Sequence, residues 1–358
     1  MAKLQKISSI CNTFSFTEYD YVKTHQVTFR NTELGKLKEL FPFKSVCRLL
    51  LPTVNRRVPK GRKELFDAEA KVALMILKSR YNLSDRHLIE RLNSDIHFQL
   101  FCGVIIPADA QLVDFKIVSR IRTELSHELN LNEFQKTIAS SLKPHIAAND
   151  LRVVMSDASC YESYVRFPTN QKLLWESVEW IHKMMVNHCR LLSIHQPRTK
   201  FNAVSEAYLS YAKTRKKTHK KGRKISRRLL HLLEKLINET SAIFSNKEIK
   251  LSSQFKKRYN VIKNILEQQT KLFNGEKVTE RIISIDKPYL RPIVRGKETK
   301  SVEFGAKVNA IQVGGFNFVE HLNFNAFHEG IRVSDCITLH KMLFKMKPRF
   351  FAGDVWNS

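Results

Sequence analysis

The feature that most constrains the fold is a long stretch of helical periodicity from Leu173 to about Leu272. It contains one glycine, Gly222, and the densest run of basic residues in the chain. Strand-like patterns precede it and follow it. If those strands belong to one sheet, the sheet is assembled from both sides of a helical insertion, which we place at about residues 170–290.

The chain before this stretch is helical in pattern over residues 31–148. Asp67 and Ser84 each stand immediately before an apolar-periodic segment, where they are predicted to cap helix N-termini. The apolar segment IHFQLFCGVIIP is predicted to be a buried turn and connector. Together these patterns predict an all-helical domain over residues 1–148.

A strand pattern begins at LRVVMSDAS, a β-branched apolar run that ends in a polar cluster. It predicts a buried strand that presents Asp157 at its end. The next segment, YESYVRFP, alternates in polarity and is predicted to be a partner strand, which Pro168 stops.

Strand character returns in VEFGAKVNAIQ, where apolar and polar residues alternate. Gly314 and Gly315 predict a tight turn into FNFVEHLNF, and therefore a hairpin. The segment VSDCITLHKMLFKM predicts a helix capped by Ser334. A short apolar strand should follow, ending at Gly353 and Asp354.

The charge of the chain implies a polyanionic partner. Lys and Arg number 61 against 34 Asp and Glu, a formal net charge of +27, which exceeds what solubility requires. Nucleic acid is the first candidate, because an anionic membrane would favour one basic amphipathic helix. A basic protein without such a partner stays open as the alternative.

Targeting signals are not apparent in the sequence. The opening MAKLQKISSICNTF lacks an apolar run of signal-peptide length, and no stretch reaches the roughly 18 apolar residues of a membrane span. The six cysteines are scattered without a close pair. We expect a cytoplasmic, nucleoid-associated protein.

The basic run KTRKKTHKKGRKISRR contains ten Lys or Arg and no acid. By charge it is predicted to contact DNA phosphates, which would make binding steeply salt-dependent. A solvated face or an RNA contact is the alternative. The predicted DNA-binding residues are Lys213, Arg215, Lys216, Lys217, Lys220, Lys221, Arg223, Lys224, Arg227 and Arg228.

Two aspartates, Asp157 and Asp354, each follow a short apolar strand pattern. A strand-end aspartate is also a common turn former or helix cap, and for each residue alone that alternative stays open. The order strand, partner strand, hairpin, helix, strand resembles a ribonuclease-H-like core with a helical insertion. In such a core adjacent parallel strands bring two carboxylates together, and their oxygens suit Mg²⁺ or Mn²⁺.

Two longer segments are similar to bacterial insertion-sequence transposases of the DDE type, in the IS4/IS5-like superfamily: SDASCYESYVRFPTNQKLLWESVEWI and RGKETKSVEFGAKVNAIQVGGFNFVEHLNFNAFHEG. The helical segment SRYNLSDRHLIERLNSDIHFQLFCGVIIPADAQLVDFKIVSRIRTEL resembles the N-terminal domain of that family. The resemblance implies a helical DNA-binding domain at 1–148 and a truncated ribonuclease-H-like catalytic domain at 149–358. The expected fold class is therefore mixed α+β.

The resemblance also implies the site and its chemistry. Asp157, with Phe167, Pro168 and Thr169 after it, matches the family's first catalytic position, and Asp354 after Gly353 matches the second. Both would bind Mg²⁺ or Mn²⁺ for cleavage and strand transfer of double-stranded DNA. The expected substrates are the element's terminal inverted repeats and target DNA, and the expected assembly is a homodimer on DNA.

The family's third carboxylate, a Glu on a later helix, would fall beyond Ser358, so we expect this chain to be inactive alone. Glu303 and Glu320, on the predicted hairpin, are interpreted as surface glutamates rather than substitutes. Three interpretations stay open: a transposase polypeptide, a catalytically inactive DNA-binding regulator, and a remnant without a role.

We assign sequence-specific recognition of the terminal repeats to the N-terminal helices, where Arg86, His87 and Arg91 lie on one short predicted helix. Helix-turn-helix geometry is possible there. A structural bundle with solvated arginines is an equal alternative. Trp175 and Trp180 are interpreted as core residues rather than base-stacking ones.

Overall fold

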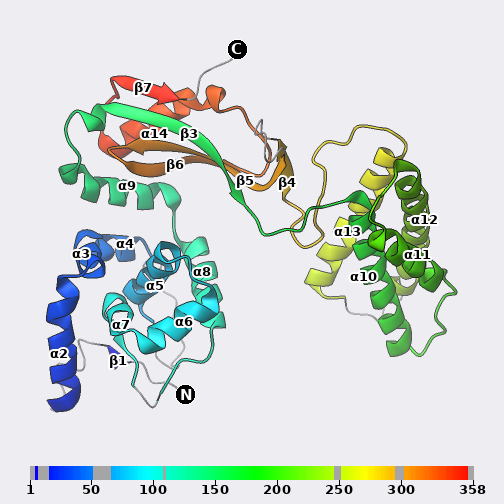
Figure 1. Cartoon of the computed structure of the whole chain (residues 1–358), viewed down its shortest axis with the longest axis horizontal. Helices are drawn as coiled ribbons and strands as arrows, with labels where there is room; N and C mark the ends of the chain where they lie inside the picture. The colour runs from blue at the N-terminus through cyan, green and yellow to red at the C-terminus, as the bar shows by residue number, and fades with distance from the viewer. Residues whose placement is uncertain are drawn as a thin grey trace. The chain divides into compact units, whose positions relative to one another are not determined.

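The structure, a computed structural model, describes residues 5–6, 16–50, 66–107, 110–245, 251–294 and 302–353 (Figure 1). Up to residue 142 its elements are β1 (Gln5–Lys6), α2 (Phe16–Arg30), α3 (Glu33–Leu40), α4 (Phe43–Leu49), α5 (Ala68–Arg80), α6 (Asp85–Ser94), α7 (Ile96–Cys102), β2 (Val104–Ile105), α8 (Lys116–Glu128) and α9 (Leu131–Leu142). The later elements are η1 (Lys143–His145), η2 (Asp150–Arg152), β3 (Val153–Glu162), α10 (Asn170–Leu191), α11 (Phe201–Lys213), α12 (His219–Phe244), α13 (Ser253–Phe273), β4 (Arg291–Val294), β5 (Val302–Val313), β6 (Phe316–Asn323), η3 (Glu329–Arg332), α14 (Val333–Phe344) and β7 (Phe350–Gly353). Helices and a sheet of several strands make this a mixed α+β fold, as predicted.

The chain divides into two compact units, which are described separately. The first contains the described residues of Met1–Met155, Gln312–Phe318 and Ile337–Ala352, and the second those of Ser156–Ile311, Val319–Cys336 and Gly353–Ser358. The domain boundary predicted between residues 148 and 149 stays a prediction. Within the described ranges, no helix has both the length and the apolar character needed to cross a membrane.

The helices of the first unit enclose a core of apolar side chains, among them Phe66, Leu74, Leu77, Leu88, Leu92, Phe98 and Phe101. The predicted helix caps are confirmed. The Asp67 side chain accepts a hydrogen bond from the Ala70 amide at the start of α5, and Ser84 accepts one from the His87 amide at the start of α6. Each cap satisfies a backbone donor that has no partner within its helix.

The segment IHFQLFCGVIIP was predicted as a turn and connector, and this is wrong. Its first part forms α7, which Asp95 caps by accepting from the amides of His97 and Phe98. Gly103, at φ 68°, ends the helix in the left-handed conformation that favours glycine. Because α7 is short and mostly buried, its sequence carries no amphipathic period to mark it as a helix.

Helices α10 to α13 form the insertion and lie in the second unit. Their shared core includes Leu174, Ile181, Met185, Leu229, Leu233, Leu236, Ile262 and Ile265. Trp175 stacks on Tyr208 with ring centroids 4.9 Å apart, and Trp180 packs on Phe255. Both tryptophans belong to this core, as predicted.

The sheet has the strand order β4-β5-β3-β7, and β6 also pairs with β5. β4 and β5 are antiparallel, with Arg291 opposite Gly305. Gly314 and Gly315 have positive φ values of 54° and 83°, so the predicted glycine turn joins β5 to β6. Figure 1 shows β3 and β7, which are neighbours in the sheet, running in the same direction.

Two further predictions are wrong, one about a strand of the sheet and one about the cap of a helix. YESYVRFP is not a partner strand: its first two residues extend β3 to Glu162, and the partners of β3 are β5 and β7, from far along the chain. Ser334 does not cap α14, because the helix begins at Val333 directly after η3, whose start is capped by His328.

Candidate functional site

Asp157 lies in the middle of β3, not at the strand end that the sequence suggested, because β3 continues to Glu162. Side chains alternate along this strand: Val154 and Ala158 are buried, whereas Met155 and Asp157 are exposed. The strand alternation thus places the Asp157 carboxylate on the open face of β3. There it accepts a hydrogen bond from the Ser159 hydroxyl at 3.3 Å.

The opposite face of β3 is fixed by polar contacts. The Ser156 hydroxyl donates to Asn309 Oδ1 at 3.3 Å and lies 3.4 Å from Cys336 Sγ. Asn309 is fully buried and also donates to Cys336 Sγ. Burial raises the pKa of the Cys336 thiol, so this sulfur is a packing group rather than a nucleophile. These contacts hold the strand that carries Asp157.

A second carboxylate, Glu329, reaches β3 next to Asp157. Its Oε2 accepts the Ala158 amide at 3.0 Å, and its Oε1 pairs with Lys307 Nζ at 3.1 Å. No local pattern predicts a role for this residue, because its partners are 171 and 22 positions away along the chain. Both oxygens are engaged, so Glu329 tethers the η3 segment to the strand.

Glu303 and Glu320 are not the surface glutamates that were predicted. Glu303 is buried, and the side chain of Glu320 is only 4% exposed. Glu320 pairs with Arg332 and accepts from Asn309 Nδ2 at 2.9 Å. The hydrogen bonds that Arg332 donates to Glu320 raise the pKa of the Arg332 guanidinium. A charge so buried is stable only because it is paired.

Asp354, the second predicted catalytic and metal-binding residue, lies outside the described residues, and so does its environment. The described part of β7 ends at Gly353, on a strand adjacent to β3. Among the described residues, no group of three or more His, Cys, Asp or Glu side chains is placed to hold a metal ion. Asp157 is exposed and has free lone pairs, so it fits as one oxygen ligand of an ion such as Mg²⁺, which often takes one or two carboxylates.

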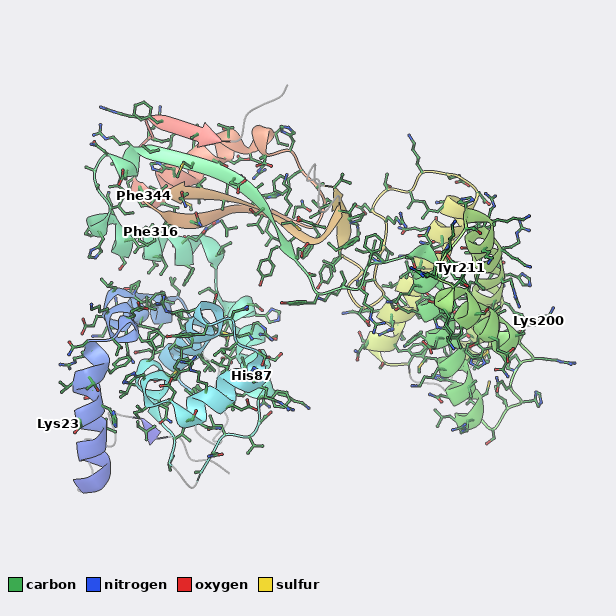
Figure 2. All side chains as sticks on the ribbon, viewed as in Figure 1. Lys23, His87, Lys200, Tyr211, Phe316 and Phe344 are labelled. Atoms are coloured by element: carbon green, nitrogen blue, oxygen red, sulfur yellow. The ribbon has the colours of Figure 1, made fainter. Side chains whose placement is uncertain are left out.

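The basic segment, residues 213–228, spans the end of α11, a short link and the first turns of α12. All ten of its Lys and Arg residues are exposed. In the part of the chain that the structure describes, none of them forms an ion pair with an acid. Arg223 and Arg227 instead lie over the ring of Phe273, at 4.8 and 5.8 Å from its centroid. Figure 2 shows Tyr211 and Lys200 on the same insertion.

The comparison with protein families concerns the helical region before the sheet. Residues 22–124 match the model of a transposase domain, DUF772. This part of the chain is similar to a transposase domain. The match begins within α2 and ends within α8, and it includes the core that these helices share. A comparison with curated proteins and one with solved structures gave no match.

Within the matched segment, the three residues predicted to read DNA have different surroundings. Arg91 lies over the rings of Tyr81 and Phe98 and pairs with Asp95 at 3.3 Å, so it braces α6 against its neighbours. Arg86 lies 5.2 Å from the ring of Phe115. His87 is exposed and labelled in Figure 2. Arg86 and His87 are both exposed, and His87 Nε2 lies 4.0 Å from Glu90 Oε2.

Proposed function

We propose that this chain is a transposase polypeptide of the DDE type, which takes part in cleaving and joining double-stranded DNA at the ends of an insertion sequence. The observation that carries the proposal is the strand arrangement. Asp157 lies on the open face of β3, and β7, which leads directly to Asp354, is its neighbour in the sheet. Two carboxylates on adjacent parallel strands would lie close enough to share a metal ion.

The arrangement of the other elements supports a ribonuclease-H-like core. The central strand β3 is followed by the helical insertion, then by the β5–β6 hairpin, then by α14 and β7. The hairpin strand β5 lies on one side of β3 and β7 on the other. The transposase domain at 22–124 gives this order its functional context.

In this proposal Asp157 and Asp354 would hold Mg²⁺ or Mn²⁺. When bound, the ion neutralises charge that develops on the phosphate and activates the attacking oxygen. The other residues of the chain position the Asp157 carboxylate. Ser159 orients one oxygen of Asp157, while Ser156 and Glu329 hold the strand on either side of it. The basic segment would bind the DNA, and a homodimer would bring two element ends together.

Metal-directed cleavage of the polypeptide tests the metal site without requiring turnover. Fe²⁺ with ascorbate and peroxide should cut the full chain near residues 157 and 353, and Mg²⁺ should compete with the cutting. Asp157→Asn should abolish both cuts, whereas Asp150→Asn, on the exposed η2 turn, should leave them. Unchanged cutting in Asp157→Asn would refute the site.

The ten exposed cations of the basic segment favour a second function, a DNA-binding regulator without catalysis. Binding and nicking assays on a duplex that carries the flanking inverted repeats distinguish the two functions. Metal-dependent nicking that Asp157→Asn removes supports the enzyme. Binding of the same duplex without nicking, unaffected by Asp157→Asn, supports the regulator.

A further inference from the structure

Beside the basic segment lies a cavity of about 250 Å³, lined by residues of α10, α11, α12 and α13 and of the link before α12. Three of its lining residues, Lys217, His219 and Arg223, are basic and exposed, and no acid lines it. The volume is below the roughly 300–1,000 Å³ of pockets for drug-sized ligands. The cavity therefore suits a small anionic group.

The cavity opens at the N-terminus of α12, a helix of 26 residues. Thr218 caps this helix by accepting the Lys221 amide, and the Gly222 amide bonds to the Thr218 carbonyl. The amides of the first turn that precede these have no partner within the helix. Amides and helix dipole together make such a terminus favourable for an anion.

A buried amide gives the second, independent indication of a ligand. Gln269 of α13 lines the cavity and is 3% exposed, yet its Nε2 has no hydrogen-bond partner among the described residues. The preceding Gln268 differs, because its amide donates to the Glu280 carbonyl and accepts from Ile282. A buried donor without a partner is costly and is rare unless something else satisfies it.

Two further polar groups lie close to the helix terminus. A Cβ atom at Gly222 would be 3.3 Å from both Gln171 Nε2 and the Tyr211 hydroxyl. Glycine at this position therefore leaves the first turn of α12 open to these donors. Lys217 also lies over the Tyr211 ring, 6.0 Å from its centroid, which keeps its ammonium near the opening.

We propose that this cavity binds one phosphate group of a DNA backbone, held by Lys217, Arg223, Gln269 and the first amides of α12. The inference rests on the proposed DNA binding and deepens it. The basic segment would then fix the register of the DNA at one phosphate, in addition to attracting it by charge.

The test measures binding of inorganic phosphate, and separately of a short DNA duplex, to the full chain at constant ionic strength. Gln269→Leu changes no charge, and it should weaken phosphate binding about tenfold, the loss expected for one hydrogen bond to a charged group. The variant should unfold at the same or a higher temperature without phosphate, because it removes an unsatisfied buried donor.

A matched pair of double variants separates the cavity from charge alone. Lys217→Gln with Arg223→Gln removes two cavity residues, and Lys220→Gln with Lys224→Gln removes the same charge from exposed positions outside it. The cavity pair should weaken phosphate binding more than the control pair. Equal weakening by the two pairs, together with no effect of Gln269→Leu, would overturn the proposal.

Binding of the duplex shows whether the cavity accepts a phosphate group of the DNA backbone. If Gln269→Leu weakens duplex binding as well, the bound group is a backbone phosphate, as proposed. If Gln269→Leu weakens only the binding of inorganic phosphate, the assignment of the bound group to DNA is wrong. Failure of the unaltered chain to bind any duplex would refute the proposed function, while the phosphate titration would still decide whether the cavity is an anion site.

Discussion

At the scale of single residues, the buried pair of Glu320 and Arg332 shows how the second unit depends on complete pairing. Arg332 bonds to both carboxylate oxygens of Glu320 and also pairs with Asp335. Asn309 supplies a further donor to Glu320. Because the Glu320 side chain is almost fully buried, its charge has little access to water if the arginine is lost.

Arg332→Met should therefore lower the free energy of unfolding by about 3–5 kcal/mol, because it leaves an uncompensated buried carboxylate. Denaturant unfolding of the full chain measures the loss. The double variant Arg332→Met with Glu320→Leu should recover part of the lost free energy of unfolding, because no unpaired buried charge then remains. A change below about 0.5 kcal/mol in the single variant, the usual range for surface substitutions, would contradict this account.

Asp85, at the start of α6 in the N-terminal helical region, provides a pH-dependent contribution to stability. Burial alone, the largest single effect, would raise the pKa of its carboxyl, but hydrogen bonds from Lys78 and Arg122 and their charges outweigh it and lower the pKa. Lys78 Nζ lies 2.7 Å from Asp85 Oδ1. A pKa lower in the folded than in the unfolded state stabilises the fold above the unfolded value, and the gain is lost as pH falls.

Asp85→Asn should thus destabilise the chain at neutral pH, and its difference from the unaltered chain should shrink as pH falls below about 3.9. Unfolding free energies at a series of pH values measure the difference. Glu128→Gln, exposed on α8, is the control and should follow the unaltered chain at every pH. A gap for Asp85→Asn that stays constant from neutral to acid pH would disprove the assignment.

Residues with local partners were predictable from the sequence, and those with distant partners were not. The caps Asp67 and Ser84 bond to amides three positions away, so their sequence context was sufficient. Glu320 and Glu329 were misread or missed because Arg332 and Ala158 come close to them only in the folded sheet. Asp157 stays a predicted site residue, and it lies within β3 rather than at the strand end that was predicted.

At the scale of elements, the first turns of α12 combine two roles on opposite faces of one amphipathic helix. Its buried face, with Ile225, Leu229 and Leu233, packs into the insertion core. Its other face carries the exposed cations of the basic segment. The helix can therefore present charge to DNA without loosening the core beneath it.

Replacing Lys216, Lys217, Lys220 and Lys221 with Gln should reduce the salt dependence of DNA binding. Each lost phosphate contact lowers the slope of log K against log salt by about 0.9. Filter-binding or fluorescence titrations over a range of salt concentrations give the slope. The control replaces Lys256, Lys257, Lys263 and Lys277, four exposed lysines of the same insertion. Equal slopes for the two quadruple variants would exclude a specific role for the segment.

Among the elements, long amphipathic helices and the glycine hairpin were predicted because their signals are local in sequence. The short α7 was missed because it is mostly buried, and β4 because its four residues include Pro292, which weakens a strand pattern. The partner strand of β3 was misassigned for another reason. A pattern within a short stretch of sequence cannot show which strands pair when an insertion separates them.

At the scale of the whole molecule, the sheet joins segments that are far apart along the chain. β7 covers one side of β3, and the Arg349 amide donates to the Arg152 carbonyl at the start of that pairing. Without β7, β3 would expose a row of backbone donors and acceptors, which is a template for pairing with another chain.

A chain shortened to end at Pro348 should therefore be less stable and should aggregate more readily than the 358-residue chain. Light scattering during refolding measures the aggregation. The helical core of the insertion does not include β7, so the helical circular dichroism signal of the shortened chain should be largely retained. Equal scattering from the two chains would mean that β7 does not protect β3.

Because β3 and β7 are far apart along the chain, they are also synthesised at different times. β3 ends at Glu162 and β7 begins at Phe350, so at about 5–20 residues per second roughly ten to forty seconds pass between them. During that time the four helices of the insertion, whose contacts are nearer in sequence, can form first. The strand that carries Asp157 thus emerges early, and its pairing with β7 must wait until β7 is made.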